Sequence, residues 1–184
     1  MKPLVINLTL FKIGWLAAVF AAAAMMPVLG TATIALVVAV HLYRSEQRRA
    51  ESLLLITSAL IGVTWESLLV QAGVLSYTSG TFAAGVAPYW IVAMWLLFAT
   101  TLNVGMRWLR NHWIVASIAG AVGGPMSFLA GAKTGAVVFT DTTTALIVIS
   151  AGWAVILPLL VQIADAFEPG SGASDVDAEL AQES

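Results

Sequence analysis

Long apolar stretches follow one another along almost the whole chain. A helix that rises about 1.5 Å per residue needs about 20 residues to cross a hydrocarbon core of about 30 Å, and the stretches reach that length. Residues 53–62 and 147–161 do not alternate between apolar and polar side chains, as a membrane β-barrel would require. The chain is also 60% hydrophobic and only 10% charged. The sequence therefore predicts an all-α integral membrane protein.

Six apolar segments predict a bundle of about six transmembrane helices. A short second helix follows a turn at Pro27 and Gly30 and ends near residue 43. Pro125 lies in the centre of the fifth helix and lacks a backbone N–H, so we expect a kink packed inside the bundle, with its freed groups satisfied there. Thr140 or Asp141 is the candidate N-cap of the sixth helix. The other five helices are expected at residues 5–26, 53–74, 88–108, 113–133 and 144–167.

The two ends of the chain are predicted to lie in the cytoplasm. With the N-terminus inside, only Lys133 falls near the far side, which satisfies the positive-inside rule. The composition then changes abruptly after Phe167 to Gly, Ser, Ala and acids. We therefore expect residues 1–167 to form the transmembrane domain and residues 168–184 to form a disordered acidic cytoplasmic tail. The basic residues on the inner side are then Lys2, Arg44, Arg48, Arg49, Arg107 and Arg110.

Several kinds of chemistry find no support in the residues. The chain has no cysteine, so disulfides, thiolate nucleophiles and cysteine-bound metals are excluded. His41 and His112 are the only histidines, and both are expected near membrane ends, so we predict no metal site. Motifs for hydrolases, ATPases and dinucleotide binding are missing, and no cofactor is predicted. Without a basic stripe, nucleic acid is not an expected partner.

Lys12 is the least expected residue in the sequence. It lies about five residues past the point where the first helix is expected to enter the membrane from the cytoplasm, and a charge at that depth costs a few kcal/mol. It also interrupts the apolar stretch, which favours a retained helix over a cleaved signal sequence. Lys12 either extends its stem to the inner headgroups or contacts a pocket or a substrate anion. Lys133 lies near the outer boundary, where extension to the headgroups alone explains it.

Glu66 lies about two thirds of the way across the third helix. Ser58, Gly62 and Glu66 share one helical face, and faces of small residues are where membrane helices pack. We therefore expect Glu66 inside the bundle, where it is protonated, hydrogen-bonded or paired. It serves either as a structural link between helices or in proton coupling or headgroup binding.

Asn103 is expected one turn inside the cytoplasmic end of the fourth helix. Amides in such positions commonly hold membrane helices together, and by depth this one is placed to meet Lys12. A direct pair between Lys12 and Glu66 is disfavoured because their depths differ by about seven residues, near 10 Å of helical rise.

The fifth segment carries small residues at intervals of three or four. This spacing places them on one helical face and predicts close packing against another helix. A groove lined by exposed backbone is the alternative. The residues are Gly120, Gly124, Ser127, Gly131 and Gly135.

Three runs carry a family resemblance. They are Trp95-Leu-Leu-Phe-Ala-Thr-Thr-Leu-Asn103, then Arg107-Trp-Leu, then Gly123-Gly-Pro-Met-Ser-Phe-Leu-Ala-Gly-Ala-Lys133-Thr-Gly-Ala. The early Asn7, Phe11, Gly14 and Trp15 and the acidic Glu66 fit the same pattern. Over about residues 4–166 the chain resembles the bacterial membrane family DUF2878. It departs from the family's frequent Asn-His and Ser-Tyr pairs at Val104 and Phe128.

The resemblance implies a small multi-helix protein of the bacterial inner membrane, of uncharacterised function. It also implies a gene near those of fatty-acid-modifying enzymes, which favours work related to lipids. Our leading hypothesis is a non-enzymatic protein that binds or moves a lipid or small amphiphile through a polar cavity. We expect membrane lipids as partners, and the ligand-binding candidates are Lys12, Glu66, Asn103 and Lys133.

Two other classes of function stay open. An accessory or scaffold protein would anchor a lipid-modifying partner through residues 44–49 and the acidic tail. A membrane enzyme acting on lipids would need Glu66 as a general acid or base, but no second catalytic group is evident at compatible depth. Oligomeric state is open as well, because the glycine-rich face can pack within one chain or between chains.

Overall fold

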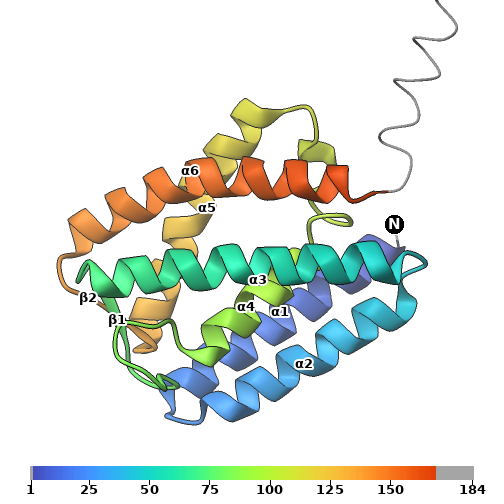
Figure 1. Ribbon diagram of the computed structural model, residues 1–184. Coiled ribbons are helices and arrows are strands. Elements are labelled where there is room, and N and C mark those ends of the chain that lie inside the picture. Colours follow the sequence, from blue (N-terminus) through green and yellow to red (C-terminus); the bar gives the residue numbers. More distant parts are fainter. Residues whose placement is uncertain (1, 169–184) are drawn as a thin grey trace, which may run out of the picture.

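The computed structural model describes residues 2–168 and is built almost entirely of helices (Figure 1). All of the helices except α4 are long and apolar enough to cross a membrane. The expected helical membrane architecture is therefore confirmed, with five helices of spanning length instead of six. The elements are α1 (Lys2–Ala23), α2 (Pro27–Arg44), α3 (Arg48–Gln71), β1 (Leu75–Tyr77), α4 (Tyr89–Ala99), the 3-10 turn η1 (Arg107–Leu109), α5 (Trp113–Thr134), β2 (Val137–Phe139) and α6 (Thr142–Ala166).

The helices form two groups. The first contains α1 to α4, in which α1 packs on α2, and α4 packs on α1, α2 and α3. The second contains α5 and α6, which pack mainly on each other and touch the first group less extensively. Figure 1 shows the N-terminus, the turn between α2 and α3, and the end of α6 at one end of the bundle, which we call the basic end. The two strands lie at the opposite end, the ribbon end.

The fourth helix is shorter than expected, because it ends at Ala99 instead of near residue 108. The hydroxyls of Thr100 and Thr101 donate hydrogen bonds of 2.7 and 2.6 Å to backbone carbonyls three residues back. The carbonyl of Thr101 then accepts bonds from three successive backbone N–H groups of a turn. Such local bonds compete with helix propagation. Residues 100–106 consequently form turns that lead to η1.

The carbonyl freed by Pro125 finds a partner on the neighbouring helix, as expected. Pro125 has no N–H to bond the carbonyl of Ala121, four residues back in α5. The hydroxyl of Ser150 on α6 donates a 2.7 Å hydrogen bond to that oxygen. The proline therefore fixes where α5 and α6 meet.

Asp141 is the N-cap of α6, which confirms one of the two candidates. Its backbone is extended, and its Oδ1 accepts a 2.8 Å hydrogen bond from the backbone N–H of Thr144. The bond satisfies one of the donors that a helix N-terminus leaves free.

The two-stranded antiparallel ribbon of β1 and β2 was not expected from the sequence. It pairs Leu75 with Phe139 and Tyr77 with Val137, so it joins the turn after α3 to the turn after α5. Gly135 ends α5 with a φ of 89°, a left-handed conformation that glycine adopts without strain. The ribbon returns Tyr77 to the side of the bundle, where its ring contacts Trp90 edge to face.

Candidate functional site

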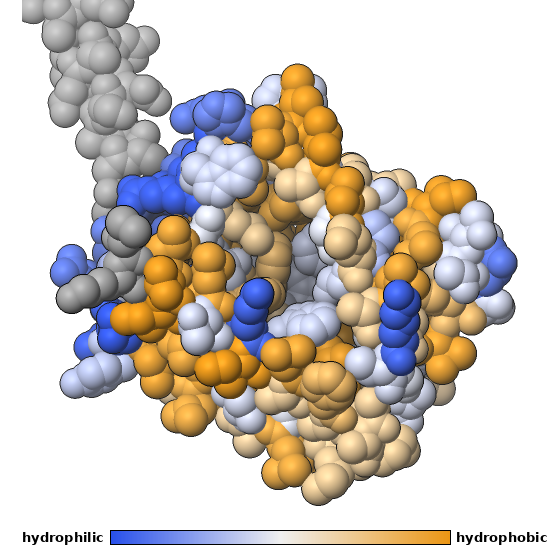
Figure 2. Space-filling view, turned by 180° about the vertical axis from the view of Figure 1, so that it is seen from behind, coloured by the Kyte–Doolittle hydropathy of each residue, from blue (hydrophilic) through white to orange (hydrophobic). Residues whose placement is uncertain are grey.

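An apolar groove of about 550 Å³ lies between the two helix groups. Side chains from α1, α4 and η1 form one wall, and side chains from α5 and α6 form the other. Figure 2 shows the molecule from behind, with a hollow in the middle of the face and mostly hydrophobic residues around it. Only a few lining residues carry polar side-chain groups, among them Lys12, Glu66 and Ser127.

Aromatic rings dominate the lining. Five of the seven tryptophans of the chain contribute to it, namely Trp15, Trp90, Trp95, Trp108 and Trp153. Trp95 of α4 stacks on Trp153 of α6 at 5.1 Å between ring centroids, and Phe98 meets Trp153 edge to face at 5.3 Å. The groove is therefore shaped by large, rigid side chains that suit an apolar ligand.

Glu66 lies at the floor of the groove and is 1% exposed. Its Oε2 accepts a 2.5 Å hydrogen bond from the Tyr77 hydroxyl, and its Oε1 accepts a 3.1 Å bond from Nε1 of Trp95. Gly62, one turn earlier, makes room for this contact, because a Cβ there would overlap the ring of Trp95. The burial of Ser58, Gly62 and Glu66 confirms the packing face predicted on the third helix.

Lys12 is exposed at the edge of the groove. It makes no hydrogen bond or ion pair with the rest of residues 2–168. One helical turn further along α1, Nε1 of Trp15 donates a 3.2 Å hydrogen bond to Oγ of Ser127 on α5. That bond joins the two walls of the groove close to Lys12.

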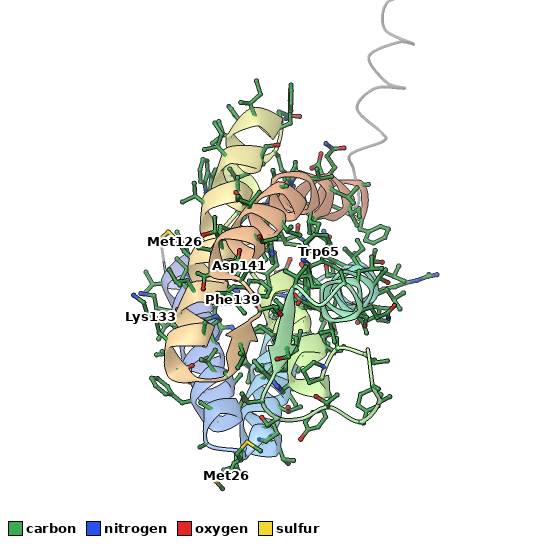
Figure 3. All side chains as sticks on the ribbon, turned by 90° about the vertical axis from the view of Figure 1, so that its left-hand side faces the viewer. Met26, Trp65, Met126, Lys133, Phe139 and Asp141 are labelled. Carbon is green, nitrogen blue, oxygen red and sulfur yellow. The ribbon has the colours of Figure 1, made fainter. Side chains whose placement is uncertain are left out.

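Asn103 and Lys133 do not line the groove. By depth Asn103 was expected to meet Lys12, but its partners are Glu51 and Arg110, because the chain leaves the helix after Ala99 and turns this amide toward the basic end. Figure 3 shows Lys133 extending away from the bundle, and its side chain is exposed.

The small residues of α5 lie where α5 meets α6 and where it faces the groove. A Cβ on Gly120 would overlap the backbone carbonyl of Trp153, and a Cβ on Gly124 would overlap the Trp153 ring. Gly123, which also lines the groove, has open space where a Cβ would be. Gly131 lies against Val137 of β2. One helix therefore supplies both a packing face and part of the groove wall.

A second set of polar side chains, which we call the basic-end cluster, lies outside the groove. His41 of α2 is hydrogen-bonded to Glu51 of α3 at 2.9 Å. The side-chain amide of Asn103 donates a 2.9 Å bond to Glu51, and Arg110 donates a 2.7 Å bond to Oδ1 of Asn103. Arg110 also pairs with Asp165 at 3.1 Å, and with Glu168. The cluster thereby connects both helix groups at the basic end.

The role of Glu51 was not predicted, because the third helix was expected to begin only at residue 53. The signal was present, because Glu51 lies seven residues before Ser58 and so continues the face of Gly62 and Glu66. Glu51 is 8% exposed and belongs to the first turn of α3. Glu168, the first residue of the predicted tail, pairs with Arg107 and Arg110, while residues 169–184 of that tail lie outside the described residues.

Within residues 2–168, no three His, Asp or Glu side chains are grouped so that they could hold a metal ion. Comparison with protein families gives a match over most of the chain. The family described as "Protein of unknown function (DUF2878)" matches residues 4–159, which is most of the chain. No curated protein and no solved structure matches.

Proposed function

The chain belongs to the DUF2878 family, and from this membership and the geometry we propose that it is a membrane protein that binds or moves a lipid or small amphiphile in the groove. The observation that carries the proposal is the groove itself, about 550 Å³ of mostly apolar and aromatic lining. Ligand sites commonly have this size and character, with a few polar groups that orient the ligand.

The length of the groove favours a chain-like ligand. Trp108 and Leu109 of η1 line it toward the basic end, and Val137 of β2 lines it toward the ribbon end. An acyl chain lying along the bundle would contact both. Because α5 and α6 touch the first helix group only in part, a change in the distance between the two groups would widen or narrow the groove. This supports movement of the ligand as well as binding.

An enzymatic role for Glu66 has less support. Both of its oxygens already accept hydrogen bonds, and 1% of the residue is exposed. A general acid or base must reach the proton that it transfers, directly or through one water. A scaffold function would rest on residues 44–49 and on the acidic tail, and residues 169–184 of that tail lie outside the described residues.

We further propose six membrane crossings with both ends in the cytoplasm of a bacterial cell. The chain leaves α3 at the ribbon end and begins α5 beyond η1 at the basic end. The segment that contains α4 must therefore pass between the two ends, although α4 has only 11 residues. Arg44, Arg48, Arg107 and Arg110 lie in or beside the elements of the basic end, which favours that end as cytoplasmic.

The test is to identify amphiphiles that copurify with the protein in a mild detergent, by extraction and mass spectrometry. Gly123→Leu places a side chain in the open space of the groove, and we expect it to remove the copurifying amphiphile without loss of fold. The matched control is Val122→Leu, since Val122 is 54% exposed on the same helix and outside the groove lining. Unchanged amphiphile content in Gly123→Leu, with thermal unfolding also unchanged, would contradict the proposal.

A further inference from the structure

We propose that the ligand of the groove is an anionic chain amphiphile whose carboxylate or phosphate group binds at Lys12. This inference rests on the proposed function and adds the chemical class of the ligand. The groove supplies apolar surface for the chain, and Lys12 supplies a charge at its edge.

Lys12 lacks a counter-charge of its own within residues 2–168. It lies ten residues past the first residue of α1, which is about 15 Å along the helix axis, and the side chains around it are largely apolar. Ionisable residues within membrane spans are costly and usually pair with another group. Among residues 2–168, Lys12 has neither an ion pair nor a hydrogen bond. An anion from outside the chain would supply the missing partner.

Ser127 supplies a hydrogen-bond donor in the neighbourhood of Lys12. Ser127 accepts the hydrogen bond from Trp15, and its own hydroxyl hydrogen has no acceptor within the described part of the chain. A hydroxyl is both a donor and an acceptor, so Ser127 can still donate. Trp15 lies one turn from Lys12 on the same face of α1, which brings Ser127 to the same stretch of the groove. An ammonium and a hydroxyl together suit a carboxylate or phosphate.

Glu66 is the other charged residue of the lining. A cationic ligand would need a carboxylate that is accessible and short of partners. Each Glu66 oxygen instead accepts a hydrogen bond, from Tyr77 or from Trp95, and the side chain is buried. Of the two charged residues of the lining, the one without a partner in residues 2–168 is therefore the cation, and this selects an anionic ligand over a cationic one.

The experiment uses quenching of tryptophan fluorescence by brominated lipids, because five tryptophans line the groove. The full-length protein in neutral detergent is titrated with dibromostearate, its methyl ester, and brominated phosphatidic acid. We expect both anionic probes to quench at lower concentration than the ester. Comparison of the two anions distinguishes a free fatty acid from a phospholipid as the source of the anionic group.

Variants separate the charge from the fold. A hydrogen bond to a charged group contributes about 1.5–3 kcal/mol, so Lys12→Gln should weaken dibromostearate binding by about tenfold or more and leave the ester unchanged. Lys12→Arg should retain the preference for the acid. Lys133→Gln is the matched control, because Lys133 is exposed on α5 and outside the groove lining. Thermal unfolding of each variant checks that the fold is retained.

Three results would overturn the inference. Equal binding of the acid and the ester, with no effect of Lys12→Gln, would contradict the anionic class of the ligand but would still agree with the proposed binding of an apolar chain. A preference for hexadecyltrimethylammonium that is lost in Glu66→Gln would replace the anion with a cation. Quenching by none of the brominated chains would contradict both the inference and the proposed function.

Discussion

The hydroxyl of Tyr77 donates a 2.5 Å hydrogen bond to Oε2 of Glu66 and so ties the β1–β2 ribbon to the interior of the helix bundle. The other oxygen of Glu66 accepts from Trp95, whose ring stacks on Trp153. One carboxyl group therefore connects α3, the ribbon and α4, and α6 is reached through the stacked rings. This arrangement holds the floor of the groove in place.

Replacing Tyr77 with Phe should destabilise the protein by about 1 kcal/mol. Hydrogen bonds between side chains in membrane proteins contribute about 0.6 kcal/mol on average and about 1.7 kcal/mol at most. Thermal unfolding in detergent, followed by circular dichroism, measures the change. Tyr43→Phe is the control, because Tyr43 is 79% exposed. Equal destabilisation by the two variants would show that the bond to Glu66 is not the cause.

Gly124 should tolerate no larger residue, because a Cβ there would overlap the ring of Trp153. Overpacking of a well-packed interior typically costs about 1–3 kcal/mol, so Gly124→Ala should lower the unfolding temperature clearly. Gly123→Ala, the adjacent residue with open space around it, should leave that temperature unchanged or raise it. A larger fall in unfolding temperature for Gly123→Ala than for Gly124→Ala would mean that α5 packs on α6 through a different face.

Arg110 should be more important for stability than Arg107, although both pair with Glu168. Side-chain exposure is 11% for Arg110 and 61% for Arg107, and only Arg110 also contacts Asn103 and Asp165. We expect Arg110→Ala to cost about 1–3 kcal/mol, because the part-buried Oδ1 of Asn103 loses its donor. Arg107→Ala should cost less than about 1 kcal/mol, as exposed ion pairs do. Unfolding in detergent at low and high salt compares them, and equal costs would contradict the prediction.

The sequence predicted the helices well where the pattern is long and apolar. The membrane class, the N-cap at Asp141 and the partner for the carbonyl freed by Pro125 follow from composition, capping and covalent geometry, which act locally. The end of α4 was missed because two successive threonines bond to the backbone, an effect that hydrophobic periodicity does not report.

The site was predictable only in part, because it depends on which helices become neighbours. Periodicity identified Glu66 and the small residues of α5 as facing the protein interior, but depth alone paired Asn103 with the wrong partner. Nothing local relates Tyr77 to Glu66, since that contact depends on a ribbon paired with a strand about 60 residues later. The groove likewise depends on the packing of α5, which contacts α6 more extensively than α1.

The N-cap of α6 predicts a dependence of stability on acid pH. Hydrogen bonds from Thr144 hold the pKa of the Asp141 carboxyl below its usual range. The stabilisation is therefore present above the unfolded pKa of about 3.9 and is lost as the pH falls through the lower folded value. The difference in unfolding temperature between wild type and Asp141→Ala should be constant near neutral pH and should narrow below about pH 4. Asp141→Asn keeps an acceptor without the charge, so the difference in unfolding temperature between Asp141→Asn and Asp141→Ala should not narrow in acid. A difference between wild type and Asp141→Ala that is also independent of pH would contradict this prediction.

The proposed orientation predicts opposite labelling at the two ends of the bundle. The natural sequence contains no cysteine, so single substitutions provide unique sites. Gln47 is exposed between α2 and α3 at the basic end, and Ala83 is exposed in the loop between β1 and α4 at the ribbon end. In intact cells a membrane-impermeant maleimide should label Ala83→Cys at once and Gln47→Cys only after the membrane is opened. Since basic residues oppose translocation, labelling of Gln47→Cys alone would mean that the positive-inside rule fails for this chain and that the groove has the inverse orientation.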